Sequence, residues 1–410
     1  MKKLTTLSSK IKGTVKISGS KNATLPIIAA SLVSADEIFL KNVPNITDVC
    51  NFINILNDIG VTTKFHNNKL MIKSTVEYKE LLFENVKAFR ASYYLMSVFL
   101  VLFNKVKIYY PGGCNIGNRP IDFHIAGFKK AGCAVNVDDD VIDITTDKLK
   151  PFIYKLPKKS LGATVNLLIV ASKIKGTSII KNASTEPEID DLISFLNKGK
   201  CKVYRSKEDI VIEGDNKKKR FIKHKIIPDR IEAFTYMVIG LFSKKLVVKN
   251  LDISHLRMPI YYLKKANANI KIRRNKAVIK SNQLNSIVVN SGHYPSLSTD
   301  QMPLLYPVFC RVSGTTVFTE GIFEGRFRVC EELKKNGSQI AIDNNKVFIT
   351  GTKDLIVNEY NANDLRGAAS LLIECILNPG SSINNLHYLE RGYDDVYNKL
   401  KKIGLNFKLE

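Results

Sequence analysis

The arrangement of apolar and polar positions repeats along the chain. Each copy opens with an apolar run of helical length, then a short strand, a polar turn, a second helix that ends near glycine, and two short strands. In the first copy these elements are expected at 22–32, 37–40, 46–59, 62–65 and 69–73. The pattern therefore predicts an α/β protein.

Five further copies begin 65 to 72 residues apart, at Arg90, Gly162, Arg230, Gln301 and Arg366. Their second helices are expected at 123–131, 189–197, 258–266, 327–335 and 393–403. A period this long with helices and strands in each copy indicates a repeat architecture. A unit of two helices on a small sheet buries both helices only when units pack together, so six copies predict two bodies of three units each.

The predicted division is discontinuous. Residues 1–20 and 229–410 are expected to form one domain, because the first strands, within 4–17, are assigned to the last three copies. Residues 21–228 form the other. The chain then crosses between domains near Ser20 and near Pro228, and two crossings predict a hinge whose cleft closes on a ligand.

Composition narrows the function classes. Apolar residues make up 45% and charged residues 24% of the 410 positions, which is typical of a globular protein. The net charge of +24 leaves two interpretations open: nucleic-acid binding, or a cleft suited to small anions. The lysines are scattered, and the densest basic run, 217–220, is expected in a turn, so the small-anion interpretation is favoured.

Targeting and redox signals are weak. The N-terminus lacks an apolar core behind its two lysines, and no apolar run is long enough to span a bilayer. Seven cysteines with no paired spacing favour reduced thiols and a cytoplasmic setting. The six histidines show no metal-ligand spacing, so no metal or cofactor is expected.

The segment 111–120, Pro-Gly-Gly-Cys-Asn-Ile-Gly-Asn-Arg-Pro, is the most distinctive in the chain. Its glycines and prolines exclude a regular helix or strand, and it lies between a strand expected at 106–110 and a helix expected at 121–131. A cysteine near a cation, as Cys114 is near Arg119, is more often a reactive thiolate. A surface loop with an incidental cysteine is the alternative.

Basic residues precede several apolar helices. Lys21, in Ser-Gly-Ser-Lys-Asn-Ala, resembles part of a phosphate cradle without being a Walker A loop, and a turn with a solvated lysine is the alternative. Arg90 and Arg366 are unexpected as caps, because helix N-termini favour acids, and they suit a polyanion. Arg391, in a turn before the last helix, is another anion ligand or an exposed side chain. Asp300 is a helix cap or a general base.

Together these motifs resemble the enolpyruvyl transferases, and among them those that act on UDP-N-acetylglucosamine. The resemblance covers nearly the full length and rests on residues 18–23, 90–92, 111–120, 162–164, 186–189, 228–232, 299–300, 323–327, 364–366 and 391–393. It implies a two-domain inside-out α/β barrel with six repeated units, three per domain.

The resemblance also implies an activity. The enolpyruvyl group of phosphoenolpyruvate passes to the 3'-hydroxyl of UDP-N-acetylglucosamine by addition and elimination through a tetrahedral intermediate, and phosphate is released. This is the first committed step of peptidoglycan synthesis, needs no metal or cofactor, and implies a cytoplasmic monomer with no membrane or nucleic-acid partner. Transfer to another acceptor, such as shikimate 3-phosphate, and a non-catalytic nucleic-acid-binding protein are the alternatives.

Site residues follow from the same resemblance. Four have catalytic roles: Cys114 as acid toward the methylene carbon and target of fosfomycin, Asp300 as base, and Lys21 and Arg391 as ligands of the anion. The expected phosphoenolpyruvate site is Lys21, Asn22, Arg90, Cys114, Arg119, Arg366 and Arg391. The expected UDP-N-acetylglucosamine site is Asn22, Arg90, Arg119, Pro120, Ile121, Asp122, Ser160, Leu161, Gly162, Asp300 and Ile322.

The chain also departs from the family pattern. Ser20 replaces a common alanine, Lys158 and Lys159 precede Ser160, Gly325 stands where asparagine is usual, and Glu390 where aspartate is usual. None of these changes removes a residue with an implied chemical role. They leave open the uridine-side contacts near Ser160 and the packing around Arg391.

Overall fold

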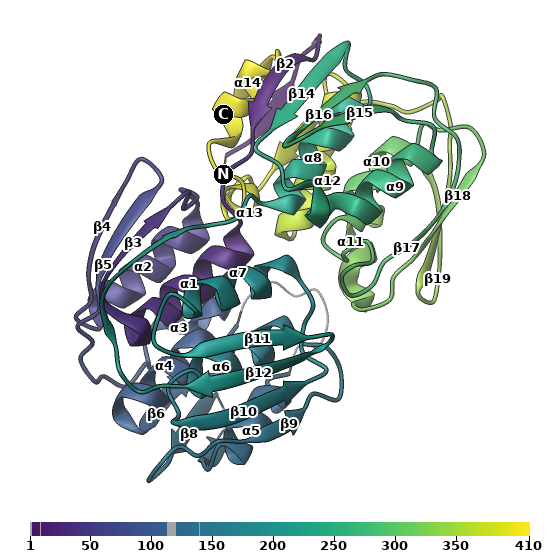
Figure 1. Cartoon of the computed structure of the whole chain (residues 1–410). Helices are drawn as coiled ribbons and strands as arrows, with labels where there is room; N and C mark the ends of the chain where they lie inside the picture. Colours follow the sequence, from purple (N-terminus) through teal and green to yellow (C-terminus); the bar gives the residue numbers. More distant parts are fainter. Residues whose placement is uncertain (1, 9, 113–119, 139) are drawn as a thin grey trace. The chain divides into compact units, whose positions relative to one another are not determined.

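The computed structural model describes residues 2–8, 10–112, 120–138 and 140–410. The described chain divides into two compact units, each with its own hydrophobic core (Figure 1). One unit, here the N-unit, contains residues 19–112 and 120–227. The other, here the C-unit, contains residues 2–18 and 228–410.

The N-unit carries three copies of the repeated pattern. Its helices are α1 (Lys21–Ser34), α2 (Thr47–Asp58), α3 (Glu84–Ala88), the 3₁₀ helix η1 (Arg90–Tyr93), α4 (Tyr94–Phe103), α5 (Asp122–Lys130), α6 (Leu161–Ala171) and α7 (Pro187–Leu196). Its strands are β3 (Ala35–Lys41), β4 (Thr62–His66), β5 (Lys69–Lys73), β6 (Lys105–Tyr109), β7 (Ala134–Asp138), β8 (Val141–Thr145), β9 (Ile153–Lys155), β10 (Gly176–Lys181), β11 (Lys202–Ser206), β12 (Asp209–Gly214) and β13 (Lys219–Lys225).

The C-unit carries the other three copies. Its helices are α8 (Arg230–Gly240), η2 (Ile253–Leu256), α9 (Arg257–Lys265), η3 (Met302–Leu305), α10 (Tyr306–Phe309), η4 (Glu324–Phe327), α11 (Arg328–Lys334), α12 (Leu365–Leu377), α13 (His387–Glu390) and α14 (Val396–Lys402). Its strands are β1 (Leu4–Thr6), β2 (Lys12–Lys16), β14 (Lys245–Lys249), β15 (Asn269–Arg273), β16 (Lys276–Lys280), β17 (Val288–Asn290), β18 (Thr315–Thr319), β19 (Gln339–Asp343), β20 (Lys346–Thr350), β21 (Glu359–Asn361), β22 (Ser382–Asn384) and β23 (Phe407–Leu409).

The described strands form small sheets with a shared topology. In the N-unit the orders are β13-β3-β5-β4, β6-β8-β7 and β11-β12-β10-β9, and in the C-unit β15-β16-β14-β2, β17-β18-β20-β19 and β21-β22-β1-β23. In the first of these sheets, β13 runs parallel to β3, whereas β5 is antiparallel to both β3 and β4. Recurrence of this order confirms the repeat predicted from the hydrophobic pattern.

The N-terminal strands complete two sheets of the C-unit. Strand β2 pairs in parallel with β14, and β1 lies between β22 and β23. The chain therefore passes between units at residues 18–19 and again at 227–228. Within the C-unit the Asp229 N–H donates to the Ser18 carbonyl at 2.9 Å, and within the N-unit the Ser20 N–H donates to the Ile227 carbonyl at 2.8 Å.

One helix of each copy is buried inside its unit. Helices α1, α4 and α6 contact one another in the N-unit, and α8, α12 and η3 do so in the C-unit (Figure 1). Every residue of α8 is buried, as is every residue of α1 after Asn22. Helices that are apolar all round pack inside, while the strands alternate buried and exposed positions. This inside-out α/β arrangement is the fold class that the sequence predicted.

Three local expectations were wrong. The apolar run after Gln301 is split into η3 and α10, because Pro303 and Pro307 each fit only the first turn of a helix. The last helix begins at Val396, not at 393, since Asp395 has a left-handed φ of 51°. The basic run 217–220 is not a turn throughout, because β13 begins at Lys219.

Candidate functional site

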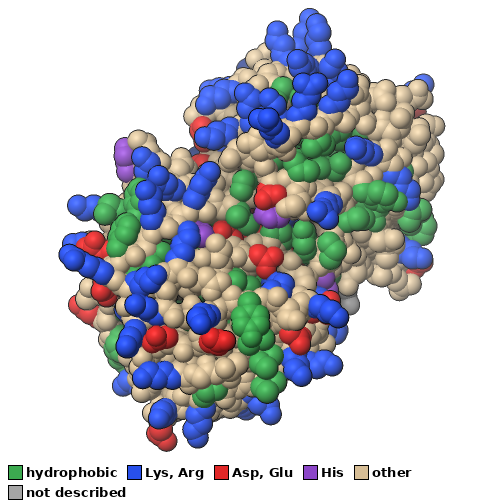
Figure 2. Space-filling view, in the orientation of Figure 1, with side chains coloured by type: hydrophobic (Ala, Val, Ile, Leu, Met, Phe, Trp, Pro, Cys, Tyr) green, Lys and Arg blue, Asp and Glu red, His purple; other side chains and the backbone are tan. Residues whose placement is uncertain are grey.

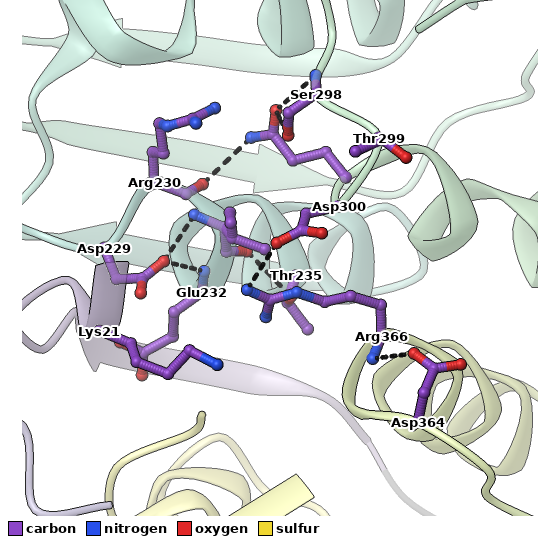
Figure 3. A network of polar contacts seen from close by, with 12 residues as sticks. Lys21, Asp229, Arg230, Glu232, Thr235, Ser298, Thr299, Asp300, Asp364 and Arg366 are labelled. Atoms are coloured by element: carbon purple, nitrogen blue, oxygen red, sulfur yellow. Dashed lines mark hydrogen bonds and ion pairs between the residues drawn. The ribbon is translucent and has the colours of Figure 1, made fainter. Parts of the chain in front are cut away.

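Asp300 lies in a turn just before η3 and is held by two arginines of the C-unit. One carboxylate oxygen, Oδ2, lies 3.1 Å from Nη2 of Arg366 (Figure 3). The other, Oδ1, pairs with Arg326. Arg366 is in the first turn of α12, where Asp364 caps the helix by accepting the N–H of Arg366 at 2.9 Å. The helix start therefore aims the Arg366 side chain at Asp300.

Arg326 is the site residue that the sequence analysis did not assign. Its Nε donates to Thr299 Oγ1 at 3.1 Å, and Thr299 in turn donates to Glu320 Oε2 at 2.9 Å. The other oxygen of Glu320 accepts the backbone N–H of Ile322 at 2.8 Å. The Phe-Glu-Gly-Arg-Phe motif at 323–327 was the available signal. One hydrogen-bonded chain thus joins Asp300 to Ile322, and both belong to the expected sugar-nucleotide site.

Arg366 is a buried cation with anionic neighbours. Only 4% of the residue is exposed, and burial alone would lower its pKa, but the Asp300 carboxylate and further groups nearby raise the net pKa above the usual value. Its guanidinium also lies 6.0 Å from the ring centroid of Tyr393. Arg391 precedes this tyrosine by two residues and is partly buried. The turn carrying Arg391 therefore lies beside the start of α12.

A second buried network surrounds Glu232 in α8. Lys399 pairs with Glu232 and also donates to Ser18 Oγ at 2.7 Å. The Ser18 N–H donates to Glu232 Oε2 at 2.9 Å, and its hydroxyl donates to Asp394 Oδ2 at 2.7 Å. Burial raises the pKa of Glu232 to about 7, although Lys399 acts to lower it. These contacts hold the last residue of the C-unit before the first crossing.

Lys21 opens α1 in the N-unit. Its Nζ lies 3.1 Å from Asp48 Oδ2, and the Asp48 side chain is only 5% exposed. Asn22 follows in the first turn and is partly buried. The ion pair directs the ammonium group, since a buried carboxylate needs a partner.

Arg90 and Gly162 meet around two rings. The Arg90 guanidinium lies 5.5 Å from the ring centroid of Tyr93, and this ring packs edge-on against His124 at 5.0 Å. A Cβ at Gly162 would lie 2.6 Å from the Tyr93 hydroxyl and 3.1 Å from His124 Cε1, so this approach requires glycine. Asn166 Nδ2 contacts His124 Nδ1 at 2.8 Å.

His124 is the second functional candidate that sequence reasoning missed. It is 3% exposed, and burial together with Arg90 lowers its pKa to about 3. A neutral imidazole therefore lies against Gly162. Dispersed histidines without metal spacing gave no sequence signal for this position.

The remaining residues expected to bind the sugar nucleotide lie at the starts of two helices of the N-unit. Ser160 is the N-cap of α6, with Oγ accepting the Ala163 N–H at 3.3 Å, and Leu161 follows it. Asp122 is in the first turn of α5, after an exposed Pro120 and a buried Ile121. Helices α5 and α6 contact each other. Free N–H groups at such starts favour anions.

Two expected residues, Cys114 and Arg119, lie outside the described residues. The six cysteines that the structure describes are free, and all but Cys50 are buried. Burial raises the pKa of these thiols, for example to about 11 in Cys133 and in Cys201. Buried thiols of raised pKa are poor nucleophiles, so the described cysteines offer no substitute for Cys114.

The described residues contain neither a cluster of metal ligands nor a membrane-spanning helix. No group of three or more His, Cys, Asp or Glu side chains is placed there to hold a metal ion. None of the described helices combines the length and the apolar character needed to cross a bilayer.

Solved structures of known proteins share this fold. The chain aligns over its full length with the enolpyruvyl transferase NikO from Streptomyces tendae, covering 98% of that chain at a TM-score of 0.90 and 19% identity. It also aligns with all of the EPSP synthase from Acinetobacter baumannii, at a TM-score of 0.82 and 16% identity. The fold is therefore that of the enolpyruvyl transferases.

Sequence comparison then identifies the family. The model of the EPSP synthase (3-phosphoshikimate 1-carboxyvinyltransferase) family matches residues 5–400, and the chain belongs to this family. Relatives named UDP-N-acetylglucosamine 1-carboxyvinyltransferase include those of Halothermothrix orenii, 36% identical with 97% of each chain covered, and Thermotoga petrophila, 37% identical with 96% of this chain and 95% of that protein covered. The protein of Pelagibacter ubique with this name is 35% identical, with 100% of this chain and 99% of that protein covered.

Proposed function

We propose that this protein transfers the enolpyruvyl group of phosphoenolpyruvate to the 3'-hydroxyl of UDP-N-acetylglucosamine and releases phosphate. The observation that carries the proposal is identity of 35–37%, over nearly the whole chain, to relatives named for this reaction. Retention of Lys21, Cys114, Asp300 and Arg366 argues against a non-catalytic protein.

The Asp300 cluster supports the first half of the reaction. In this proposal, Asp300 takes the proton of the acceptor hydroxyl, and the oxygen of that hydroxyl bonds to C2 of phosphoenolpyruvate. Cys114 gives a proton to the methylene carbon, which completes a tetrahedral intermediate. Each oxygen of Asp300 contacts one arginine and keeps a further lone pair, so the carboxylate can accept the hydroxyl proton while Arg326 and Arg366 hold it in place.

Elimination reverses only the proton transfer at carbon, and phosphate leaves with the proton that came from the acceptor hydroxyl. The methyl carbon loses a proton, the enol double bond forms again, and the C2–phosphate bond breaks. The cations Lys21, Arg119, Arg366 and Arg391, with Arg90, are proposed to neutralise the carboxylate and phosphate. The guanidinium fork of Arg366 suits either anion.

The acceptor separates the leading proposal from the alternative in the same family. Phosphate release is measured with phosphoenolpyruvate and UDP-N-acetylglucosamine, and separately with phosphoenolpyruvate and shikimate 3-phosphate. Release with the sugar nucleotide alone supports the proposal. Release only with shikimate 3-phosphate reassigns the acceptor, and release with neither rejects an enolpyruvyl transferase activity.

Further aspects of the assignment are parts of the same proposal. The proposed reaction belongs to peptidoglycan synthesis, and we place it in the cytoplasm as the work of a monomer that needs no metal or cofactor. Size-exclusion chromatography with light scattering tests the monomer, with the mass of 46.1 kDa expected. Independence from metal is tested by measuring turnover after exhaustive chelation, and turnover is expected to persist.

A further inference from the structure

The outer face of the sheet β15-β16-β14-β2 in the C-unit is a lysine array. Its exposed positions carry eight cations, here called the basic face: Lys12, Lys16, Lys245, Lys249, Lys271, Arg273, Lys276 and Lys280. A dense group of Lys and Arg side chains is visible over these strands at the top of Figure 2. Between them lie partly exposed Val247 and Val278.

The pairing register aligns the cations across the strands. Lys16 is opposite Lys249, Lys249 is opposite Lys276, and Lys276 is opposite Arg273, so one row of four cations crosses the sheet. At the other end of β2, Lys12 is opposite Lys245. By ordinary strand dimensions the face measures ~14 Å across the strands and ~13 Å along them.

No carboxylate balances this array in the described structure. None of the eight side chains forms an ion pair with an Asp or Glu among the described residues. In other sheets some lysines are opposite a carboxylate, as Lys202 is opposite Glu213 and Lys107 is opposite Asp143, and shorter like-charge pairs also occur, as Lys41 is opposite Lys225 and Lys69. The basic face differs in carrying a full row of four cations across its sheet. Like charges directly opposite one another destabilise a sheet. The basic face thus carries eight cations without a carboxylate partner among the described residues, which favours an anionic partner outside the chain.

We propose that the basic face docks flat on the surface of an anionic lipid bilayer. A planar array lets all eight cations meet headgroups at once, and each Lys or Arg near such a surface contributes ~1 kcal/mol. Val247 and Val278 at the centre also favour a bilayer, because the headgroup region accepts apolar side chains between cations.

A nucleic acid fits the face less well. The eight cations are accompanied by Thr14, Asn269 and two valines, with no aromatic ring on which a base could stack. Seven of the eight are lysines, which act as point charges, whereas arginine forks are the better ligands of individual phosphates. Duplex binding is therefore an outcome of the test that would count against the bilayer.

The test is co-sedimentation of the full-length protein with vesicles in buffer of fixed ionic strength. Vesicles of phosphatidylglycerol and phosphatidylcholine are compared with vesicles of phosphatidylcholine alone. The variant combines Lys245→Gln, Lys249→Gln, Lys276→Gln and Lys280→Gln. The matched control removes four charges elsewhere, at exposed lysines that form no ion pair with the described residues: Lys129→Gln, Lys155→Gln, Lys181→Gln and Lys346→Gln. Circular dichroism melting verifies that both variants fold.

The expected result is binding to the anionic vesicles only. Loss of four lysines from the basic face should weaken this binding at least about 100-fold, whereas the control stays within about threefold. Three results would overturn the proposal: no sedimentation of the native protein with anionic vesicles, equal losses in both variants, or a short DNA duplex that displaces the protein from the vesicles at equimolar phosphate. If the variant fails to fold, single Lys249→Gln and Lys346→Gln proteins replace the two sets, with about a fivefold loss expected for the first alone.

Discussion

The carboxylate of Asp300 and the guanidinium of Arg366 lie 3.1 Å apart, although 66 positions separate them in the chain. Arg366 is almost fully buried, and the Asp300 side chain is 22% exposed. The pair therefore has one face toward solvent, from which a hydroxyl can reach the carboxylate. This relationship makes Asp300 the clearest test of the proposed chemistry.

Replacing Asp300 by Asn should lower kcat about 10²–10⁴-fold, because an amide cannot accept the hydroxyl proton. Steady-state phosphate release measures the loss. Asp343→Asn, at an exposed position of β19, is the matched control and should retain native turnover. Native turnover in Asp300→Asn would remove the residue from the mechanism.

The substitution Arg326→Lys tests whether Arg326 positions Asp300 or binds substrate. The fork of Arg326 reaches Thr299 and Asp300 together, and a lysine point charge reaches one of them. We expect kcat to fall about 10–100-fold with KM for phosphoenolpyruvate changed less, because a misplaced base costs more in the transition state than in binding. A rise in KM at unchanged kcat would instead indicate that Arg326 is a substrate ligand.

Cys114→Ala should abolish or severely slow turnover and prevent inactivation by fosfomycin, because alanine has no proton or nucleophile to offer. Cys50→Ala is the control, since Cys50 is the partly exposed cysteine among those described. Mass spectrometry after fosfomycin treatment detects the covalent adduct. Full activity together with full inactivation of Cys114→Ala would reject the assigned role.

Glu232 should make the stability of the C-unit depend on pH. Its folded pKa of about 7 lies above the ordinary 4.5, so the folded protein holds a proton between these pH values that the unfolded chain releases. The stabilisation is complete below pH 4.5 and is lost as pH rises through 7, and it amounts to ~3 kcal/mol.

Thermal unfolding of the native protein and of Glu232→Gln between pH 5 and 8 checks this expectation. The melting temperature of the native protein should fall relative to that of the variant as pH rises. Glu213→Gln, on the exposed face of β12, controls for general effects of charge and should follow the native profile. Parallel profiles of native protein and Glu232→Gln would contradict the expectation.

Gly162→Ala should destabilise the N-unit by ~1–3 kcal/mol, because the new methyl group would clash with Tyr93 and His124. Displacement of these rings should also raise KM for UDP-N-acetylglucosamine. Gly292→Ala meets nothing nearer than the Ser296 side chain at 3.3 Å and is the milder control. Equal melting temperatures for native protein and Gly162→Ala would show that the rings move without cost.

Local patterns were enough to predict much of the fold. Apolar runs of helical length marked α1, α6 and α12, and glycine marked the ends of the second helices, because these signals depend on neighbouring residues. Proline chemistry at Pro303 and Pro307 was visible in the sequence, yet its effect on the helix after Gln301 was underestimated. The left-handed residue Asp395 had no such signal.

The chain by itself determined the repeat, the α/β class and the motifs, since each follows from the period and type of nearby side chains. Only the tertiary structure decided which distant groups meet: Arg326 with Asp300, His124 with Gly162, and Glu232 with Lys399. It likewise gathered lysines from four strands, scattered between positions 12 and 280, onto one face. Such meetings depend on strand register and helix packing, which are properties of the folded chain as a whole.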